Sequence, residues 1–316
     1  MNDKQDKKKF LVIGLGPIGS IFACHLKAAG HGVFGIDIWQ EHIQQIRKNG
    51  IRIEKLVNLH QHLDEALTRI KGLDNLEFDY VVISIKTPYM DSIIGELKKY
   101  KSGFNIVSLQ NGIDTEEYLA NFFEKERVLR IVVNYAGNIT APGNISMSFF
   151  HKPNYVGGVV TPEPCPPAIE LARILNNAGL ETEYTPDIKR FTWKKTILNS
   201  ILAPLSALLG MTMADVMTCG ETRSMVELLL KESLKVAEHM GYDYGESFFQ
   251  QSMDYLSGAG HHKPSMLIDI EKGNPTEIDF INGKIADYGQ RFNIPVPLHT
   301  AITALIKAKE QYPGQS

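Results

Sequence analysis

The stretch Phe10–Gly19, FLVIGLGPIG, decides the fold of this 316-residue chain. Its four leading apolar residues are typical of a short buried strand, and Pro17 opens a segment with helical periodicity that runs to Ala29. Between them, Gly14-Leu15-Gly16-Pro17-Ile18-Gly19 fits the pattern G-x-G-x-x-G. In this setting the glycines allow a tight turn, a phosphate close to the backbone, and close helix–strand packing. The stretch predicts a dinucleotide-binding loop, with a plain glycine turn as the alternative.

A carboxylate follows at the end of the next strand candidate, 33–38. Asp37 lies at roughly the 20-residue distance from the glycines that the fingerprint requires. A carboxylate there accepts hydrogen bonds from the ribose hydroxyls of NAD and repels the 2′-phosphate of NADP. Ile38 and Trp39 come next, so no arginine stands ready for that phosphate. We expect NADH or NADPH as cofactor, with NADH favoured; the alternative for Asp37 is a turn or cap residue.

Strand-like and helix-like segments alternate through the first part of the chain. The strand candidates are 10–13, 33–38, 80–85, 106–109, 128–134, 145–149, 155–160 and 181–184, and the helix candidates are 17–29, 41–49, 88–100, 115–123 and 168–178. Beyond Pro186 only helical periodicity remains, at 191–209, 222–240, 265–272 and 280–288. This alternation indicates right-handed crossovers and a mostly parallel sheet. The sequence predicts an α/β fold: a dinucleotide-binding Rossmann domain over 1–186, then an all-helical substrate and catalytic domain over 187–316.

Composition narrows the class of protein. Hydrophobic residues make up 43% and charged residues 22%, as in globular chains. A net charge of -3 argues against a general nucleic-acid surface. Three separated cysteines give no disulfide framework and no zinc pair, so we expect a reduced, cytoplasmic compartment. We do not expect the charged start, MNDKQDKKKF, to be a signal peptide, because it has no apolar run. Asn199, Pro204 and Asp215 interrupt the apolar stretch 197–217, which predicts a buried helical hairpin and no membrane span.

The helical part offers groups for chemistry. Hydride transfer to a ketone leaves negative charge on its oxygen, which needs a cation or a proton donor within reach. Lys195 and Asn199 are four residues apart and share one face of a helix. Their apolar neighbours would desolvate the lysine and make it a readier acid, while the amide would bind substrate. Lys194 points about 100° away, as a surface residue does. The alternative is a solvated helix face.

Several motifs together resemble those of the ketopantoate reductases (2-dehydropantoate 2-reductases), over nearly the whole chain. The resemblance rests on the glycine motif, Ile85-Lys86-Thr87, Gln110-Asn111-Gly112, Trp193-Lys194-Lys195 with Asn199, Ser265-Met266-Leu267 with Asp269-Ile270, and Thr276-Glu277-Ile278-Asp279 with Ile281-Asn282-Gly283. It implies an oxidoreductase that reduces a 2-keto acid with NAD(P)H. The first candidate is 2-dehydropantoate giving pantoate, a step of pantothenate and coenzyme A biosynthesis.

The resemblance also implies roles for single residues. Lys195 would be the general acid that protonates the nascent alkoxide, and Glu277 would help to position or tune it. Asn199 and Ser265 would bind the carboxylate and hydroxyl groups of the substrate. Asn111 would lie between substrate and nicotinamide.

Further cofactor contacts and their alternatives follow from the same motifs. Lys86, at a strand end, would lie near the cofactor together with Asn111. The alternative for Lys86 is an ordinary surface lysine, and the alternative for Asn111 is an ordinary Asn-Gly turn. Ser265 is also a candidate helix N-cap after a proline. Thr276 is likewise a candidate cap, in which case Glu277 merely complements a helix dipole.

Two departures from the family pattern stand out. Ala203 occupies a position where the family commonly has a second asparagine, which removes a polar contact to the substrate. Asp37 replaces the neutral-then-arginine pattern of NADPH-using members. His261 and His262 form a pair without a third ligand nearby, so we expect no metal.

Two other functions remain open. A β-hydroxyacid-type dehydrogenase also combines a Rossmann domain, a helical domain, and a lysine four residues before an asparagine. A non-catalytic NAD-binding sensor would keep the glycine loop without chemistry. We expect a small-molecule 2-keto acid as partner, no nucleic acid and no membrane, and a homodimer stays open as the assembly.

Overall fold

The apolar run before the glycine motif forms a strand, and the segment after it forms a helix, as expected. In this computed structural model β1 (Lys9–Ile13) is buried from its second residue on, and α1 (Pro17–Ala28) begins with Pro17 in its first turn. The structure describes residues 7–71, 73, 76–100, 103–160 and 164–312; most of the charged start, 1–6, lies outside them.

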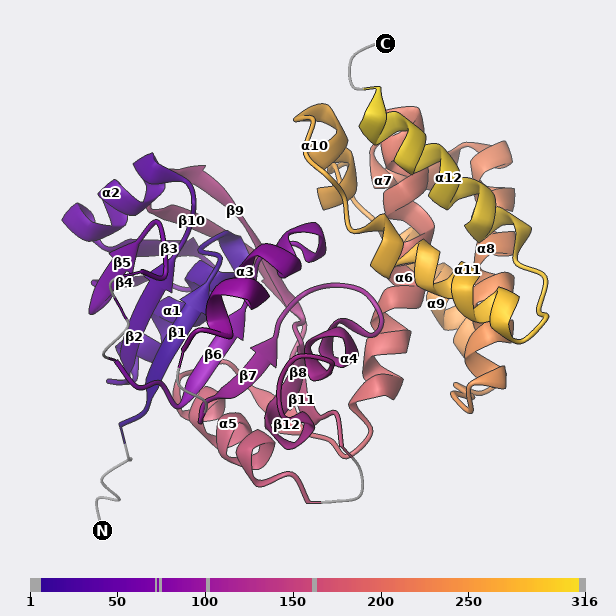
Figure 1. Cartoon of the computed structure of the whole chain (residues 1–316). Coiled ribbons are helices and arrows are strands. Elements are labelled where there is room, and N and C mark those ends of the chain that lie inside the picture. The colour runs from indigo at the N-terminus through magenta and orange to yellow at the C-terminus, as the bar shows by residue number, and fades with distance from the viewer. Residues whose placement is uncertain (1–6, 72, 74–75, 101–102, 161–163, 313–316) are drawn as a thin grey trace. The chain divides into compact units, whose positions relative to one another are not determined.

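The chain forms two units (Figure 1). The first comprises Met1–Ile85, Tyr89–Gln110 and Thr115–Ile188, and the second comprises Lys86–Pro88, Asn111–Asp114 and Lys189–Ser316. The last passage between them follows Ile188, close to the boundary after residue 186 that the sequence predicts. The two short segments of the second unit that interrupt the first have no counterpart in the sequence prediction.

An eight-stranded sheet organises the first unit. Its order is β12 (Thr182–Tyr184), β11 (Asn154–Gly158), β8 (Val128–Val132), β7 (Asn105–Ser108), β6 (Tyr80–Ile83), β1, β2 (Gly32–Ile36) and β5 (Glu65–Leu67). Every neighbouring pair is parallel except β8 and β11, so the predicted α/β class with a mostly parallel sheet is confirmed. The order runs outward from β1 through β2 to β5 and resumes at β6 on the other side of β1. Ligands of such sheets bind at this reversal, beyond the carboxyl ends of the strands.

A second, four-stranded sheet was not predicted. Its order is β4 (Leu59–Gln61), β3 (Ile51–Lys55), β10 (Asn144–Phe150) and β9 (Tyr135–Ala141). Helix α1 packs on β1 and β2 and also on all four of these strands, which explains why its residues 19–26 are all buried. Strand β3 alternates exposed Arg52 and Glu54 with buried isoleucines, a period-two strand pattern that the sequence prediction did not use, and its parallel partner β10 lies far along the chain.

The remaining helices of the first unit are short. They are α2 (Gln40–Asn49), α3 (Met90–Leu97), α4 (Thr115–Ala120), η2 (Lys125–Arg127) and α5 (Pro166–Asn177), while the 3₁₀ turn η1 (Thr87–Tyr89) begins in the second unit and ends at Tyr89 in the first. The helix predicted over 88–100 begins as the 3₁₀ turn η1 and ends at Leu97.

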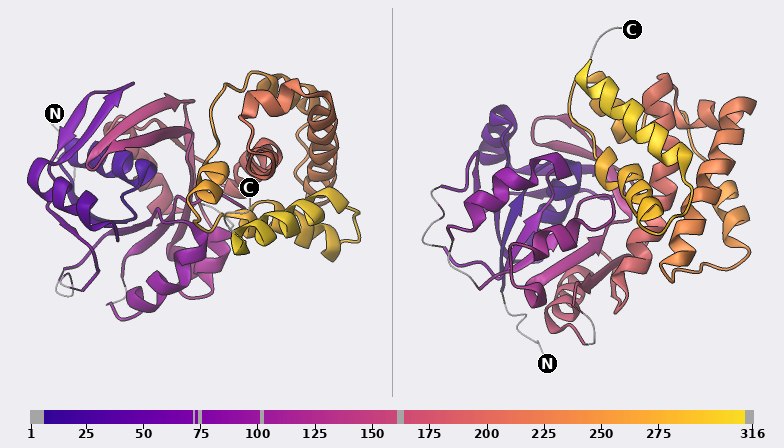
Figure 2. Two further views of the ribbon diagram at one scale, coloured as in Figure 1. Left: turned by 90° about the horizontal axis from the view of Figure 1, so that it is seen from above. Right: turned by 45° about the vertical axis from the view of Figure 1, so that its right-hand side comes forward.

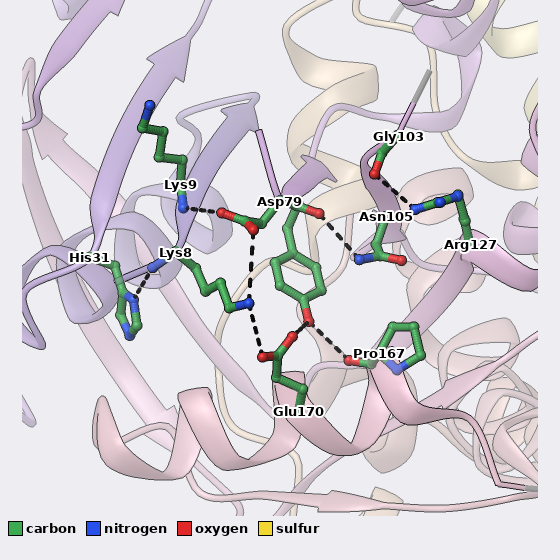
Figure 3. Close-up of polar contacts among 10 residues, drawn as sticks. Lys8, Lys9, His31, Asp79, Gly103, Asn105, Arg127, Pro167 and Glu170 are labelled. Carbon is green, nitrogen blue, oxygen red and sulfur yellow. Dashed lines mark hydrogen bonds and ion pairs between the residues drawn. The ribbon is translucent and has the colours of Figure 1, made fainter. Parts of the chain in front are cut away.

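Polar contacts fix the amino end of the sheet, away from the glycine loop (Figure 3). Asp79 accepts a hydrogen bond from the backbone N–H of Lys9 at 2.8 Å. Glu170 on α5 accepts from the Tyr80 hydroxyl at 2.7 Å and pairs with Lys8 at 3.1 Å. Burial, together with this carboxylate, raises the pKa of Tyr80 above its ordinary value. These contacts tie β1 and β6 to α5, so this end of the sheet is structural.

The second unit is helical (Figure 2). Its elements are α6 (Ile188–Leu209), α7 (Met213–Thr218), α8 (Gly220–His239), α9 (Phe248–Ser257), α10 (Ser265–Glu271), η3 (Ile278–Phe280), α11 (Asn282–Arg291) and α12 (Pro297–Gln311). The sequence missed α9 and α12. The apolar stretch 197–217, predicted as a hairpin, is divided between α6, which continues through Pro204, and α7. Among the described residues, no helix has both the length and the apolar character needed to cross a membrane.

Helix α6 contributes a continuous stripe to the core of this unit. Trp193, Ile197, Ile201 and Leu205 recur every four residues and are at most 2% exposed. This spacing keeps one face of the helix apolar along its length. The left view of Figure 2 looks along α6.

A buried polar network crosses the same core. The Asn282 amide donates to Nδ1 of His299 at 3.1 Å and to the Ser200 carbonyl at 2.8 Å. Because Nδ1 accepts, Nε2 carries the proton and donates to the Ser233 hydroxyl at 2.8 Å. The network ties α6, α8, α11 and α12 together. Burial lowers the pKa of His299 to about 4.

This pKa shift predicts acid sensitivity of the helical unit. An unfolded histidine titrates near 6.5, above the folded value of about 4, so stability is lost as pH falls through this window. Between pH 7 and pH 5, His299 alone should remove about 2 kcal/mol of unfolding free energy. Urea unfolding at both pH values checks this. The variant His299→Gln, which does not titrate, should lose about 2 kcal/mol less than wild type over the same interval; equal losses contradict the assignment.

Candidate active site

The three glycines of the loop after β1 have different surroundings. Gly14 has φ +95°, and a Cβ on it would lie 2.7 Å from the Ser84 backbone. A Cβ on Gly19 would lie 1.9 Å from the Gly14 carbonyl oxygen, so neither position accepts a side chain. A Cβ on Gly16 would meet nothing within 4 Å. The second glycine therefore lies beside open space, and the residues present fit a dinucleotide phosphate there, at the start of α1.

Asp37 is half-buried next to this loop. Its Oδ2 accepts the Leu15 N–H at 2.8 Å, and its Oδ1 accepts the Trp39 N–H at 2.9 Å. The second bond is the turn that the sequence left open as an alternative. Each carboxylate oxygen keeps a further lone pair, so the turn does not exclude a ribose contact.

Lys86 lies in one of the two short segments of the second unit and forms an ion pair there. Its ammonium pairs with Asp269 on α10. Asp269 is 5% exposed. Burial raises the pKa of this carboxyl, and the lysine opposes the rise. Lys86 is thus a half-buried, paired lysine, unlike the surface residue of the alternative.

Glu277 receives hydrogen bonds from both short segments. Its Oε2 accepts from the Asn111 amide at 3.2 Å, and its Oε1 accepts from the Thr87 N–H at 3.4 Å. Burial raises the pKa of Glu277, opposed by these two donors and by nearby Lys86. The Thr276 hydroxyl accepts the Ile278 N–H at 3.2 Å, but the cap position of η3 is Glu277, whose side chain does not cap the turn. Glu277 nonetheless does more than complement a helix dipole.

The glycine after Asn111 has a steric reason. Gly112 has φ +101°, and a Cβ on it would lie 2.5 Å from the carbonyl oxygen of Phe280. The next residue, Ile113, donates its N–H to that same carbonyl at 2.8 Å. Asp114 then accepts from the Tyr288 hydroxyl at 2.9 Å. The segment 111–114 is therefore fastened to η3 and α11.

Lys195 and Asn199 lie on α6, and both are half-buried beside the apolar stripe. Lys194 is exposed, with its ammonium 5.6 Å from the Phe248 ring centre. Ser265 is exposed at the first residue of α10, where Pro264 takes the cap position. The contacts described so far form one cluster, made up of Lys86, Asn111, Asp269 and Glu277. Within the described part of the chain, no hydrogen bond joins Asn199 or Ser265 to this cluster.

The sequence assigned no role to Asp269 or Thr87. Both stand in the motifs that carry the family resemblance, which is the signal that could have identified them. His261 is exposed and lies 3.5 Å from Asp215. The described residues contain no group of three or more His, Cys, Asp or Glu side chains placed to hold a metal ion.

A glycine loop at the order reversal of a parallel sheet, followed by a helical unit, defines the class of nucleotide-binding α/β oxidoreductases with a helical second domain. Family models place the chain further. The model for ketopantoate reductase PanE/ApbA matches residues 10–159, and the model for the ketopantoate reductase PanE/ApbA C terminal matches 187–310. The chain belongs to the ketopantoate reductase family.

A relative at 32% identity agrees with this placement, and two solved structures share the fold. A 2-dehydropantoate 2-reductase of Pyrococcus horikoshii is 32% identical, over 98% of this chain and 99% of its own length. One of Aquifex aeolicus is 25% identical, over 96% and 97%. The structure of 2-dehydropantoate 2-reductase from Geobacter metallireducens has a TM-score of 0.86 at 23% identity, covering 95% and 99%. That of D-mandelate dehydrogenase with NADH and anilino(oxo)acetate has 0.83 at 23%, covering 96% and 98%.

The ion pair of Lys86 and Asp269 predicts an asymmetric response to mutation. The side chain of Asp269 is 7% exposed and that of Lys86 is 36% exposed, so a lone Asp269 is the more poorly hydrated. We expect Lys86→Met to cost about 1–3 kcal/mol of unfolding free energy and Asp269→Asn to cost less. The double variant should cost less than the sum, by about 1 kcal/mol.

Urea unfolding of the three variants checks this double-mutant cycle. The exposed pair of Lys307 and Asp279, at 2.8 Å in the same unit, is a matched control whose coupling should be about 0–0.5 kcal/mol. Equal coupling in both pairs contradicts the expectation.

Proposed function

We propose that this chain reduces a 2-keto acid with hydride from NAD(P)H, with 2-dehydropantoate giving pantoate as the first candidate. The observation that carries the proposal is the cluster in which Lys86 meets Asp269 and Asn111 meets Glu277. It gathers an amide, an ammonium and two carboxylates, groups that can form hydrogen bonds with a polar ligand. Family membership and a 2-dehydropantoate 2-reductase relative at 32% identity support the same reaction.

The first unit would hold the cofactor. Gly16 and the start of α1 would bind the phosphates, because the backbone there lies beside open space. Asp37 would accept the ribose hydroxyls, and its charge opposes a 2′-phosphate. When bound, the nicotinamide supplies the hydride. The finer proposal is that residues 1–186 serve the cofactor and 187–316 serve the substrate.

The second unit would supply the proton. Lys195 would donate it from Nζ to the developing alkoxide oxygen, since partial burial weakens the hydration of its ammonium. Asn199, one turn further along the same helix face, would orient the substrate, and Ser265 would bind its carboxylate or hydroxyl. Glu277 would hold the Asn111 amide in position.

One substitution favours a second candidate substrate. Ala203 is half-buried one turn beyond Asn199 and offers no hydrogen bond. A branched 2-keto acid that places an apolar group beside Ala203 would need no hydrogen bond from this position. NADH and NADPH oxidation against a panel of 2-keto acids that includes 2-dehydropantoate separates these substrates. Dinucleotide binding without oxidation of any of them would favour the sensor.

We also propose a cytoplasmic location, supported by three free cysteines, Cys24, Cys165 and Cys219.

Lys195→Ala should lower kcat by on the order of 10²–10⁴, the effect of losing a general acid, with NADH binding retained. The matched control is Lys194→Ala, which removes the neighbouring lysine on an exposed face and should leave kcat within about twofold. Steady-state kinetics and NADH titration measure both quantities. An unchanged kcat for Lys195→Ala would remove it from the mechanism.

Asp37 sets the expected cofactor preference. Because its carboxylate repels a 2′-phosphate, kcat/KM should be higher with NADH than with NADPH. Asp37→Asn removes the charge and keeps an oxygen acceptor, so the ratio of kcat/KM with NADH to kcat/KM with NADPH should fall toward one. A strong NADPH preference of the wild-type enzyme would refute this role of Asp37.

A further inference from the structure

Both backbone polar groups of Leu15, the middle residue of Gly14-Leu15-Gly16, form hydrogen bonds to side chains. Leu15 is fully buried, and its N–H donates to Asp37 Oδ2 at 2.8 Å. Its carbonyl oxygen accepts two hydrogen bonds, from the Ser20 hydroxyl at 2.6 Å and from Nε2 of His42 at 2.9 Å. His42 stands in the first turn of α2, outside every motif that the sequence singled out.

His42 is itself fixed on three sides. Its ring is fully buried, and Nδ1 accepts the backbone N–H of Gly143 at 3.0 Å, in the turn between β9 and β10. Since Nδ1 accepts, the proton of the neutral ring lies on Nε2, the nitrogen that faces the Leu15 carbonyl. The Trp39 ring stacks on the imidazole at 5.1 Å and 10°. Burial lowers the pKa of His42 below its ordinary value, which keeps the ring neutral.

This arrangement fixes one peptide plane of the loop. In a trans peptide the C=O and the following N–H point in opposite directions. With the Leu15 carbonyl held by His42 and Ser20, the Gly16 N–H is directed away from both donors. Gly16 is also the glycine beside open space. The N–H that a phosphate would need is therefore oriented before any ligand binds.

We propose that His42 is a positioning residue for the dinucleotide: it holds the Leu15–Gly16 peptide so that the Gly16 N–H faces the phosphate site. The second sheet takes part, because Gly143 sets the tautomer of the ring. Orienting a donor in advance removes an ordering cost from binding, so the effect belongs to cofactor affinity and not to the hydride step. This inference rests on the proposed function, in which the loop binds a nicotinamide dinucleotide.

The test replaces His42 with a ring that cannot donate. His42→Phe should raise the dissociation constants of NADH and NADPH, measured by calorimetry, by about tenfold, the effect of losing one buried hydrogen bond. At saturating cofactor, kcat should stay within about twofold, because the catalytic groups are unchanged. His42→Gln, whose amide can donate, should recover part of the affinity.

A matched control separates positioning from general destabilisation. His25 is a second buried histidine of the first unit, and its Nδ1 bonds the Ala178 carbonyl at 2.7 Å, away from the loop. His25→Phe should lower the melting temperature to a similar extent and leave both dissociation constants unchanged. If His42→Phe fails to fold, Ser20→Ala removes the other donor to Leu15 and should raise the constants about threefold.

Hydrogen exchange of the ligand-free chain gives a readout that does not depend on the proposed function. His42→Phe should speed exchange of the Leu15 amide relative to His25→Phe, because the loop loses its anchor. Faster exchange in a chain whose wild type binds neither nucleotide would refute the proposed function and the role of His42 in dinucleotide binding, and would leave only its anchoring of the loop. Unchanged exchange together with unchanged dissociation constants would overturn the role of His42.

Discussion

The carboxylate of Glu277 is the point on which the candidate site depends. Its two oxygens accept hydrogen bonds from Thr87 and Asn111, which come a few residues after β6 and β7 and lie far from Glu277 in the sequence. The Lys86–Asp269 pair and the Ile113–Phe280 backbone bond add to the same fastening. Burial makes such ionised groups costly, so a stable arrangement needs donors for each of them. The site has these donors, and they belong to the short segments 86–88 and 111–114.

Local patterns account for what the sequence could predict. The glycine motif and the alternation of strands with helices give β1, α1 and the mostly parallel sheet, because each signal lies within a few neighbouring residues. The stripe of α6 from Trp193 to Leu205 is predictable for the same reason. The roles of Lys195, Asn199 and Ser265 stay predictions, since they concern a bound substrate.

Other features depend on partners that no local pattern reveals. Strand β3 pairs with β10, about a hundred residues away, so its neighbours along the chain do not reveal its partner, although its alternation of exposed and buried residues is itself a strand pattern. The ion pair of Lys86 with Asp269 spans 183 residues. His42 is a single histidine in a polar helix, and only its distances to Leu15 and Gly143 reveal that it supports the loop.

The short segments 86–88 and 111–114 also limit where the chain can be divided into fragments. The chain leaves the first unit after Ile85, after Gln110 and after Ile188, and returns to it twice. A cut at one position therefore cannot yield two complete parts, because the amino-terminal fragment keeps Ile113 without the apolar cluster that buries it. Exchange of helical units between relatives would need matching changes in both short segments. The two units of this protein should therefore be expressed and redesigned together.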